Sequence, residues 1–172
     1  MTDPGALLPR GEYRDRLLTP RGAPVDRGWR SNLIVDRCRF LIAGFMRGDG
    51  PLGIQRLRVG RGLAAWDAVP PGPPPPSTQA LADPAPWEVA LAPAAIEYLD
   101  GAGNPAAGPT QRLRLVVTLG PGEPAGEDPF PLREFGLFGE FGGEDYMINY
   151  VRHGVIHKPA DATLERTIQL VF

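Results

Sequence analysis

The two histidines, His153 and His157, are the first residues to consider for chemistry. The segment 150–157 around them has the alternation of a β-strand. The two imidazoles would then share one face and stand about 13 Å apart, at about 3.3 Å per residue. That separation is too large for one metal ion, and no cysteine or carboxylate lies nearby at metal-ligand spacing. The sequence therefore predicts no metal site.

The chain also has little material for nucleophilic or acid–base catalysis. Cys38 falls on the apolar face of an expected helix, where a thiol is usually a small core residue. Ser31 and Ser77 are the two serines, and neither lies in a Gly-x-Ser-x-Gly elbow. Carboxylate pairs such as Glu134 and Glu140 lie near expected turns, where acidic side chains are usually solvated. We therefore predict no catalytic residue and no enzyme.

A short glycine motif, Gly60-Arg61-Gly62, follows an expected strand, as a phosphate-binding loop would. No clear helix follows the motif, and the third glycine of the dinucleotide fingerprint is missing. We predict no cofactor and no small-molecule substrate. The net charge is -2 with 22% charged residues, whereas duplex-DNA binders usually carry a basic surface stripe, so no nucleic-acid partner is expected.

Length and composition indicate one globular domain. The chain has 172 residues, of which 42% are hydrophobic, enough for a core. Its single cysteine rules out an intrachain disulfide and fits a reducing compartment. The first residues lack the apolar core of a signal peptide, and no run approaches the roughly 20 apolar residues of a membrane helix. We expect cytoplasmic synthesis and no membrane partner.

Residues 1–30 are polar, rich in arginine and interrupted by prolines, which predicts an extended arm outside the domain. Two interpretations remain open. The arm is either a mobile tail or a segment that becomes ordered on a neighbouring subunit. In the second case its contacts would come from arginine and large apolar side chains, which are common in interface hot spots: Arg14, Arg16, Leu17, Leu18 and Trp29.

Residues 31–172 are expected to form a single β-rich domain that begins with a helix over 31–47. Apolar residues recur there at three- and four-residue spacing, with Ser31 or Asn32 as the N-cap and Gly48 at the end. They are Ile34, Cys38, Leu41, Ile42, Phe45 and Met46.

Alternating apolar residues predict a strand over 53–60 and a long hairpin over 94–119. Three more strands are expected over 132–141, 146–157 and 164–172, the first two joined at Gly142-Gly143. Between 63 and 86, the proline tract is either a docking ligand or a stiff surface excursion. The fold class is thus α+β, mostly β: an antiparallel sheet or sandwich with one N-terminal helix and long Pro/Gly loops.

The most distinctive segment, Leu132-Arg-Glu-Phe-Gly-Leu-Phe-Gly139, resembles a signature of tail-collar and tail-fibre-type proteins of phages and contractile injection systems. A turn, a strand and a C-terminal hydrophobic strand follow it here in the same order as in that pattern. The resemblance implies a structural subunit of the adaptor, collar or baseplate/fibre-attachment type. Its partners would be other tail or baseplate proteins and further copies of itself in a homo-oligomer, within an assembled particle.

Within this segment, Phe135 and Phe138 fall on opposite faces of the strand, as do Arg133 and Glu134. A strand that is apolar on both faces must be covered on both sides, either by its own fold or by a neighbouring subunit. The second interpretation predicts interface roles for Arg133, Glu134, Phe135 and Phe138, and for Phe172 on the last strand. The alternative function is a stand-alone peptide- or carbohydrate-binding module with an exposed aromatic patch around Trp66 and Trp87.

Overall fold

The computed structural model describes residues 9–172 and confirms the predicted mostly β class with one α-helix. The helix α1 spans Asp36–Arg47, and two short 3-10 helices, η2 and η3, span Ala64–Asp67 and Pro93–Ala95. The strands are β1 (Arg10–Leu18), β2 (Val25–Ile34), β3 (Leu52–Gly60), β4 (Trp87–Ala90), β5 (Ile96–Tyr98), β6 (Arg112–Leu119), β7 (Phe130–Phe141), β8 (Glu144–Lys158) and β9 (Thr163–Val171).

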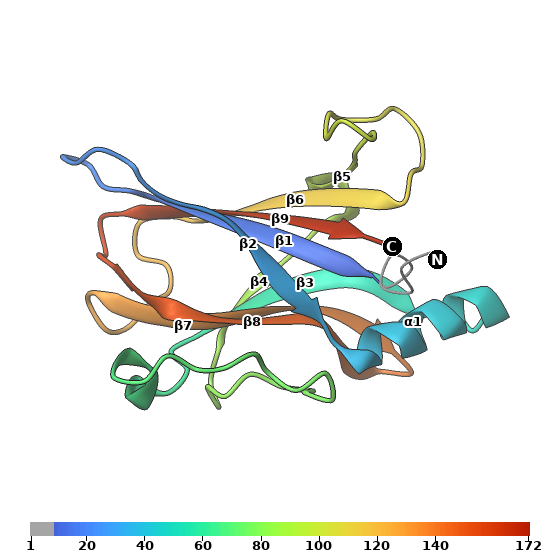
Figure 1. The fold of residues 1–172 in the computed structure, drawn as a ribbon, viewed down its shortest axis with the longest axis horizontal. Helices are drawn as coiled ribbons and strands as arrows, with labels where there is room; N and C mark the ends of the chain where they lie inside the picture. Colours follow the sequence, from blue (N-terminus) through green and yellow to red (C-terminus); the bar gives the residue numbers. More distant parts are fainter. Residues whose placement is uncertain (1–8) are drawn as a thin grey trace, which may run out of the picture.

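These strands form one antiparallel sheet in the order β4-β3-β7-β8-β2-β1-β9-β6-β5. The sheet curls into two facing layers, with β1, β9 and β6 above β7 and β8 in Figure 1. β2 joins the layers, since it pairs with β1 along its length and with β8 only at Leu33 and Ile34. The main apolar core draws side chains from both layers, including Leu57, Phe135, Leu137, Leu115, Ile168 and Leu170.

The prediction of an extended N-terminal arm is wrong for residues 10–30. They form β1 and most of β2, and β1 pairs with β9 from Arg10–Val171 to Leu18–Thr163. The buried residues of β1 are Gly11, Tyr13 and Asp15, which alternate with more exposed residues but are not all hydrophobic. The first part of the arm, residues 1–8, lies outside the described residues.

A buried polar network explains how β1 brings a carboxylate into the core. Asp15 and Arg166 are each 2% exposed, and the Arg166 Nε and Nη2 atoms donate to the two carboxylate oxygens at 2.7 Å. Arg166 Nη2 also donates to His153 Nε2 at 3.1 Å, while His153 Nδ1 donates to the Gly154 carbonyl at 2.8 Å. The guanidinium lies 3.8 Å from the centre of the Phe135 ring. The network therefore connects both layers through β1, β8 and β9.

The helix begins later than predicted and ends where predicted. Leu33 and Ile34 pair with β8, so residues 31–34 stay in β2 and the expected cap at Ser31 or Asn32 is wrong. Val35 is the N-cap, without a side-chain hydrogen bond. Gly48 ends the helix with φ 84°, and its amide bonds to the Phe45 carbonyl at 3.1 Å.

The remaining β elements match the sequence predictions closely. The strand expected over 53–60 is β3, and the expected 94–119 hairpin contains β5 paired with β6. Gly142 and Gly143, with φ 62° and 81°, form the two-residue turn between β7 and β8. Positive φ at both turn residues matches the twist of a tight hairpin and favours glycine.

Candidate interaction surfaces

Cys38 and His153, whose side chains could be reactive, are buried in the core. Cys38 is buried, as predicted, and burial raises the pKa of its thiol to about 11, which keeps it protonated. His153 is buried in the network with Arg166, whereas His157 is exposed. Within residues 9–172, no three side chains of the His, Cys, Asp and Glu type gather closely enough to hold a metal ion.

Arg133 and Glu134, which are adjacent in the β7 motif, both bind the proline-rich loop of residues 61–86 to the sheet. Arg133 Nε and Nη2 donate to the two carboxylate oxygens of Asp67 at 2.8 and 2.6 Å, and Nη1 donates to the Arg61 carbonyl at 2.9 Å. This bidentate geometry is the strong form of an arginine–carboxylate contact. It anchors η2 at the start of the loop.

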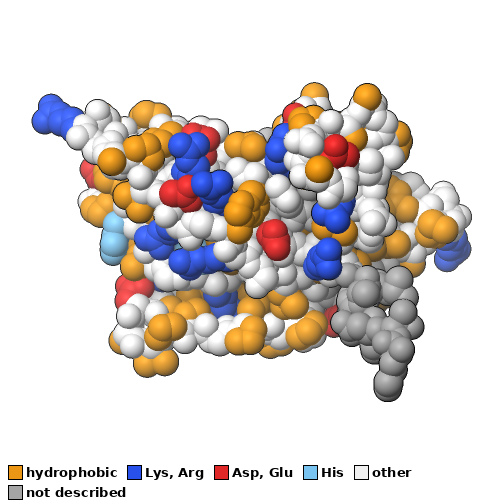
Figure 2. All heavy atoms as spheres, turned by 45° about the horizontal axis from the view of Figure 1, so that its top comes forward, with side chains coloured by type: hydrophobic (Ala, Val, Ile, Leu, Met, Phe, Trp, Pro, Cys, Tyr) orange, Lys and Arg blue, Asp and Glu red, His pale blue; other side chains and the backbone are white. Residues whose placement is uncertain are grey.

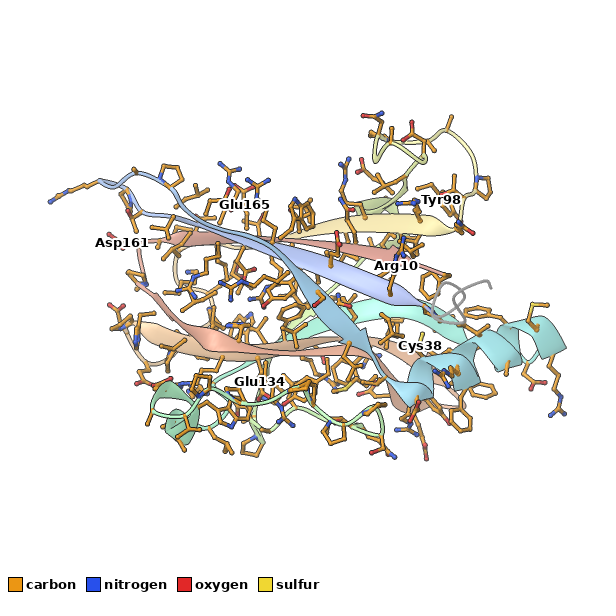
Figure 3. All side chains as sticks on the ribbon, in the orientation of Figure 1. Arg10, Cys38, Tyr98, Glu134, Asp161 and Glu165 are labelled. Carbon is orange, nitrogen blue, oxygen red and sulfur yellow. The ribbon has the colours of Figure 1, made fainter. Side chains whose placement is uncertain are left out.

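Glu134 anchors the other end of that loop. It is fully buried, and its carboxylate accepts hydrogen bonds from the Ala82 and Asp83 amides at 3.0 and 2.7 Å and from the Tyr150 hydroxyl. Burial and the bond to Glu134 raise the pKa of Tyr150 to about 12. Figure 3 shows Glu134 on the side of the lower layer where the green loop runs.

The two phenylalanines of the motif are also covered by the same chain. Phe135 lies in the core between the layers, while Phe138 packs with Val35, Met147 and Tyr150 on the other side of the sheet. Leu81 of the loop packs against this second cluster. All four side chains, Arg133, Glu134, Phe135 and Phe138, are therefore buried within one chain, and their interface roles stay predictions that this structure gives no exposed surface for.

The interface candidates in the segment that was expected to be an N-terminal arm lie on β1 and β2. Arg14 is paired with Asp26, and Arg16 lies 3.8 Å from Glu165. Leu17 packs against the core and Leu18 is half-buried, so neither protrudes. Trp29, on β2, and Phe172, next to the end of β9, remain exposed, and β1 lies between these two strands in the sheet. The structure thus brings Arg14 next to Trp29, its register partner across β1 and β2, whereas Leu17 packs into the core and Phe172 lies apart from this pair.

The tryptophans of the alternative binding module do not form one exposed patch. Trp87 packs against the main core, whereas Trp66 lies in η2, 5.3 Å from the Arg152 guanidinium. The face visible in Figure 2 carries basic and acidic side chains close together rather than one basic stripe.

Helix α1 carries an exposed apolar surface that hydrophobic periodicity does not predict. Only Cys38, Leu41 and Gly44 of the helix are buried. Four large apolar side chains of the helix remain in solvent, at exposed fractions of 61, 37, 51 and 86%: Phe40, Ile42, Phe45 and Met46. Ile42, Phe45 and Met46 share one side of the helix, and we call these three residues the α1 patch; Phe40 lies on another side.

The position of α1 explains why the α1 patch is exposed. Leu41 packs over β7 at Gly139, where an added Cβ would meet Leu41 at 2.9 Å and the Gly53 carbonyl at 2.5 Å. Beyond that contact the helix projects past the ends of the strands, at the right of Figure 1. Hydrophobic side chains are visible at this projecting end in Figure 2. Isolated exposed apolar residues are common, but several on one projecting helix indicate an interaction site.

Two further findings bear on how the chain is classified. Among residues 9–172, no helix is both long and apolar enough to cross a membrane. Comparison of the chain with protein-family models, curated proteins and solved structures finds no match.

Proposed function

We propose that the protein is a non-enzymatic structural subunit of a phage-tail-like or contractile injection particle, and that it docks onto other subunits through the α1 patch. The adaptor, collar or baseplate/fibre-attachment roles are the ones this proposal covers. The partners are other tail or baseplate proteins and further copies of the chain. Synthesis in the cytoplasm precedes incorporation into the particle.

The observation that carries the proposal is the exposure of Ile42, Phe45 and Met46 on a helix that projects from the sheet. Their three- and four-residue spacing places them on one side of the helix. Phenylalanine and methionine are enriched at the centres of protein interfaces, where charged residues are depleted. Exposed apolar side chains are unfavourable in water, and an assembly subunit removes them from water when it docks.

The resemblance of the Leu132–Gly139 motif supports the class of particle. In this chain the motif builds a rigid base for the projecting helix, because Gly139 admits Leu41 and Arg133 and Glu134 hold the adjacent loop. The motif residues thus stabilise the fold, and the proposed docking contact is the α1 patch. This separates the residues that keep the subunit rigid from those that meet a partner.

Isolated particles test this proposal. The chain is co-expressed with the genes of a phage tail or contractile injection particle, particles are purified, and its copy number relative to the tube protein is measured by mass spectrometry. We expect a fixed stoichiometry for the wild type and loss from the particle for the double variant Phe45→Ser, Met46→Ser. The matched control is Val116→Ser on β6, where an apolar residue is 47% exposed far from α1 in the sheet order. Particles that lack the wild-type chain would refute the proposal.

A further inference from the structure

Residues 69–76, the proline tract of the loop that β7 anchors, run along the outside of the lower layer (Figure 1). The rings of its six prolines fix φ at about −65°. Every residue from 69 to 75 except Pro71 precedes a proline, which pushes its backbone into extended conformations. No helix or strand forms within 70–75. The sequence therefore favours the polyproline II helix here, with three residues per turn.

Exposure along the tract repeats with the same period. Pro71 and Pro74 are half-buried, whereas the other residues of 70–76 are exposed. With three residues per turn and a rise of about 3.1 Å per residue, Pro70, Pro73 and Pro76 form a row at intervals of about 9 Å. We call these three residues the proline ridge. One side of the tract thus rests on the protein, and the proline ridge is open to solvent.

Polar contacts hold both ends of the tract. Asp67, two residues before it, is paired with Arg133. At the other end, the Asp36 amide at the start of α1 donates to the Pro76 carbonyl at 2.9 Å. The tract is therefore ordered before a partner arrives, which lowers the entropy cost of binding.

The middle of the tract is open to further contacts. Within residues 9–172, no backbone amide donates to the carbonyls of residues 70–74. A hollow of about 290 Å³ lies beside Pro73 and Pro74, and its opposite wall includes Leu33 of β2 and Tyr150 of β8. This hollow leaves room for a side chain of a partner next to the proline ridge.

The composition of the tract restricts the class of partner. No charged residue occurs from 68 to 82. Val69, at the start of the tract, is 72% exposed and extends its apolar surface. An acidic or basic surface would find no opposite charge here, whereas polyproline helices dock into grooves lined by aromatic rings. A groove of aromatic side chains is therefore the complementary surface.

We propose that the proline ridge binds a partner domain whose groove is lined by aromatic side chains, in the manner of SH3, WW and EVH1 domains. The ridge prolines pack between the aromatic rings, and hydrogen-bond donors of the groove bind the open carbonyls of residues 70–74. The proline ridge shares no residue with the α1 patch, and the inference does not depend on the proposed function.

Purified domains of these three classes test the inference on the full chain. One SH3, one WW and one EVH1 domain are each titrated to millimolar concentration into the isotope-labelled chain, and amide NMR shifts are followed. We expect saturable binding of at least one domain. The largest shifts should occur at Gly72, Ser77 and Thr78, because prolines carry no amide hydrogen. Failure of all three domains to bind, or shifts centred on α1, would overturn the inference.

Two double variants locate the contact. Pro73→Ala, Pro76→Ala removes two rings of the proline ridge and should weaken binding about fivefold or more. The matched control is Pro20→Ala, Pro24→Ala, which removes two exposed prolines between β1 and β2 and should bind like the wild type. Circular dichroism checks that both variants fold. Equal affinity of the Pro73→Ala, Pro76→Ala variant and the wild type would show that the proline ridge is not the contact.

A third variant separates this contact from docking through the α1 patch. Phe45→Ser, Met46→Ser should bind the same domain as tightly as the wild type does. Loss of binding in this variant would place the contact on α1 and overturn the inference.

Discussion

At the scale of single residues, the network of Asp15, Arg166 and His153 places charged groups in the core between the two layers. A buried guanidinium and a buried carboxylate are each costly to remove from water, and they are tolerated here because their hydrogen bonds are bidentate at 2.7 Å. The neighbouring imidazole must stay neutral, since a second cation would face Arg166.

Removing one partner of the buried pair should destabilise the protein far more than removing a partner of a surface pair. Arg166→Met leaves Asp15 charged and buried, so we expect the free energy of unfolding to fall by about 3–5 kcal/mol. The control is Arg16→Met, which breaks the exposed pair with Glu165. This variant should change the free energy of unfolding by about 1 kcal/mol or less. Urea denaturation measures both. Equal losses in the two variants would contradict a dominant role for the network.

The same network makes stability depend on pH through His153. Burial and the nearby Arg166 charge lower the pKa of His153 to about 3, from about 6.5 in an unfolded chain. Between these values the unfolded chain binds a proton that the folded chain does not. The free energy of unfolding should therefore decrease by about 1.4 kcal/mol per pH unit as pH falls from 6 to 4.

The pH dependence has a matched pair of test variants. His153→Gln keeps an amide oxygen for Arg166 but cannot titrate, so its unfolding free energy should change less between pH 6 and 4. His157→Gln, at an exposed position, should keep the wild-type slope. Burial pushes the pKa of Asp15 upward, but Arg166 lowers it overall, so Asp15 adds a further loss only at lower pH. A wild-type slope in His153→Gln would show that another group controls the transition.

At the scale of elements, the loop of residues 61–86 behaves as a cover held by two side chains of β7. Glu134→Gln should loosen its second anchor, because the uncharged amide leaves one of the Ala82 and Asp83 amides without an acceptor. The expected effect is about 1–3 kcal/mol at this site. Hydrogen–deuterium exchange should show faster exchange within 81–86, while Glu88→Gln on the exposed side of β4 leaves these amides protected. Unchanged protection in Glu134→Gln would rule out this anchor.

Hydrophobic alternation in the sequence predicts the strands whose buried residues are apolar. It does not predict a strand such as β1, where a buried position is polar. β6 alternates buried Leu115, Val117 and Leu119 with more exposed residues, and the two-glycine turn marks the β7–β8 hairpin. β1 has the same alternation in space, but Asp15 occupies a core position. Its burial depends on Arg166, a partner 151 positions away in the chain. No local pattern contains that information, so a central strand was interpreted as a mobile or docking arm.

At the scale of the whole molecule, the candidate site was predicted only in part. The apolar residues of the helix were recognised, but periodicity assigns them to one buried face. How many stay exposed depends on how far the helix projects past the sheet, which is a tertiary property. Conversely, the motif residues Arg133 to Phe138 were distinctive in sequence because the fold needs them, and their burial leaves docking to other residues.

The most direct test of the docking role is the mass of the purified chain measured by light scattering, alone and mixed with candidate tube, sheath and baseplate proteins. We expect the wild type to form a complex of defined mass with at least one of them. Phe45→Ser, Met46→Ser should lose that complex while keeping the wild-type thermal stability, and Val116→Ser should retain it. A wild type that stays monomeric in every mixture, or a complex that survives loss of Phe45 and Met46, would contradict the account.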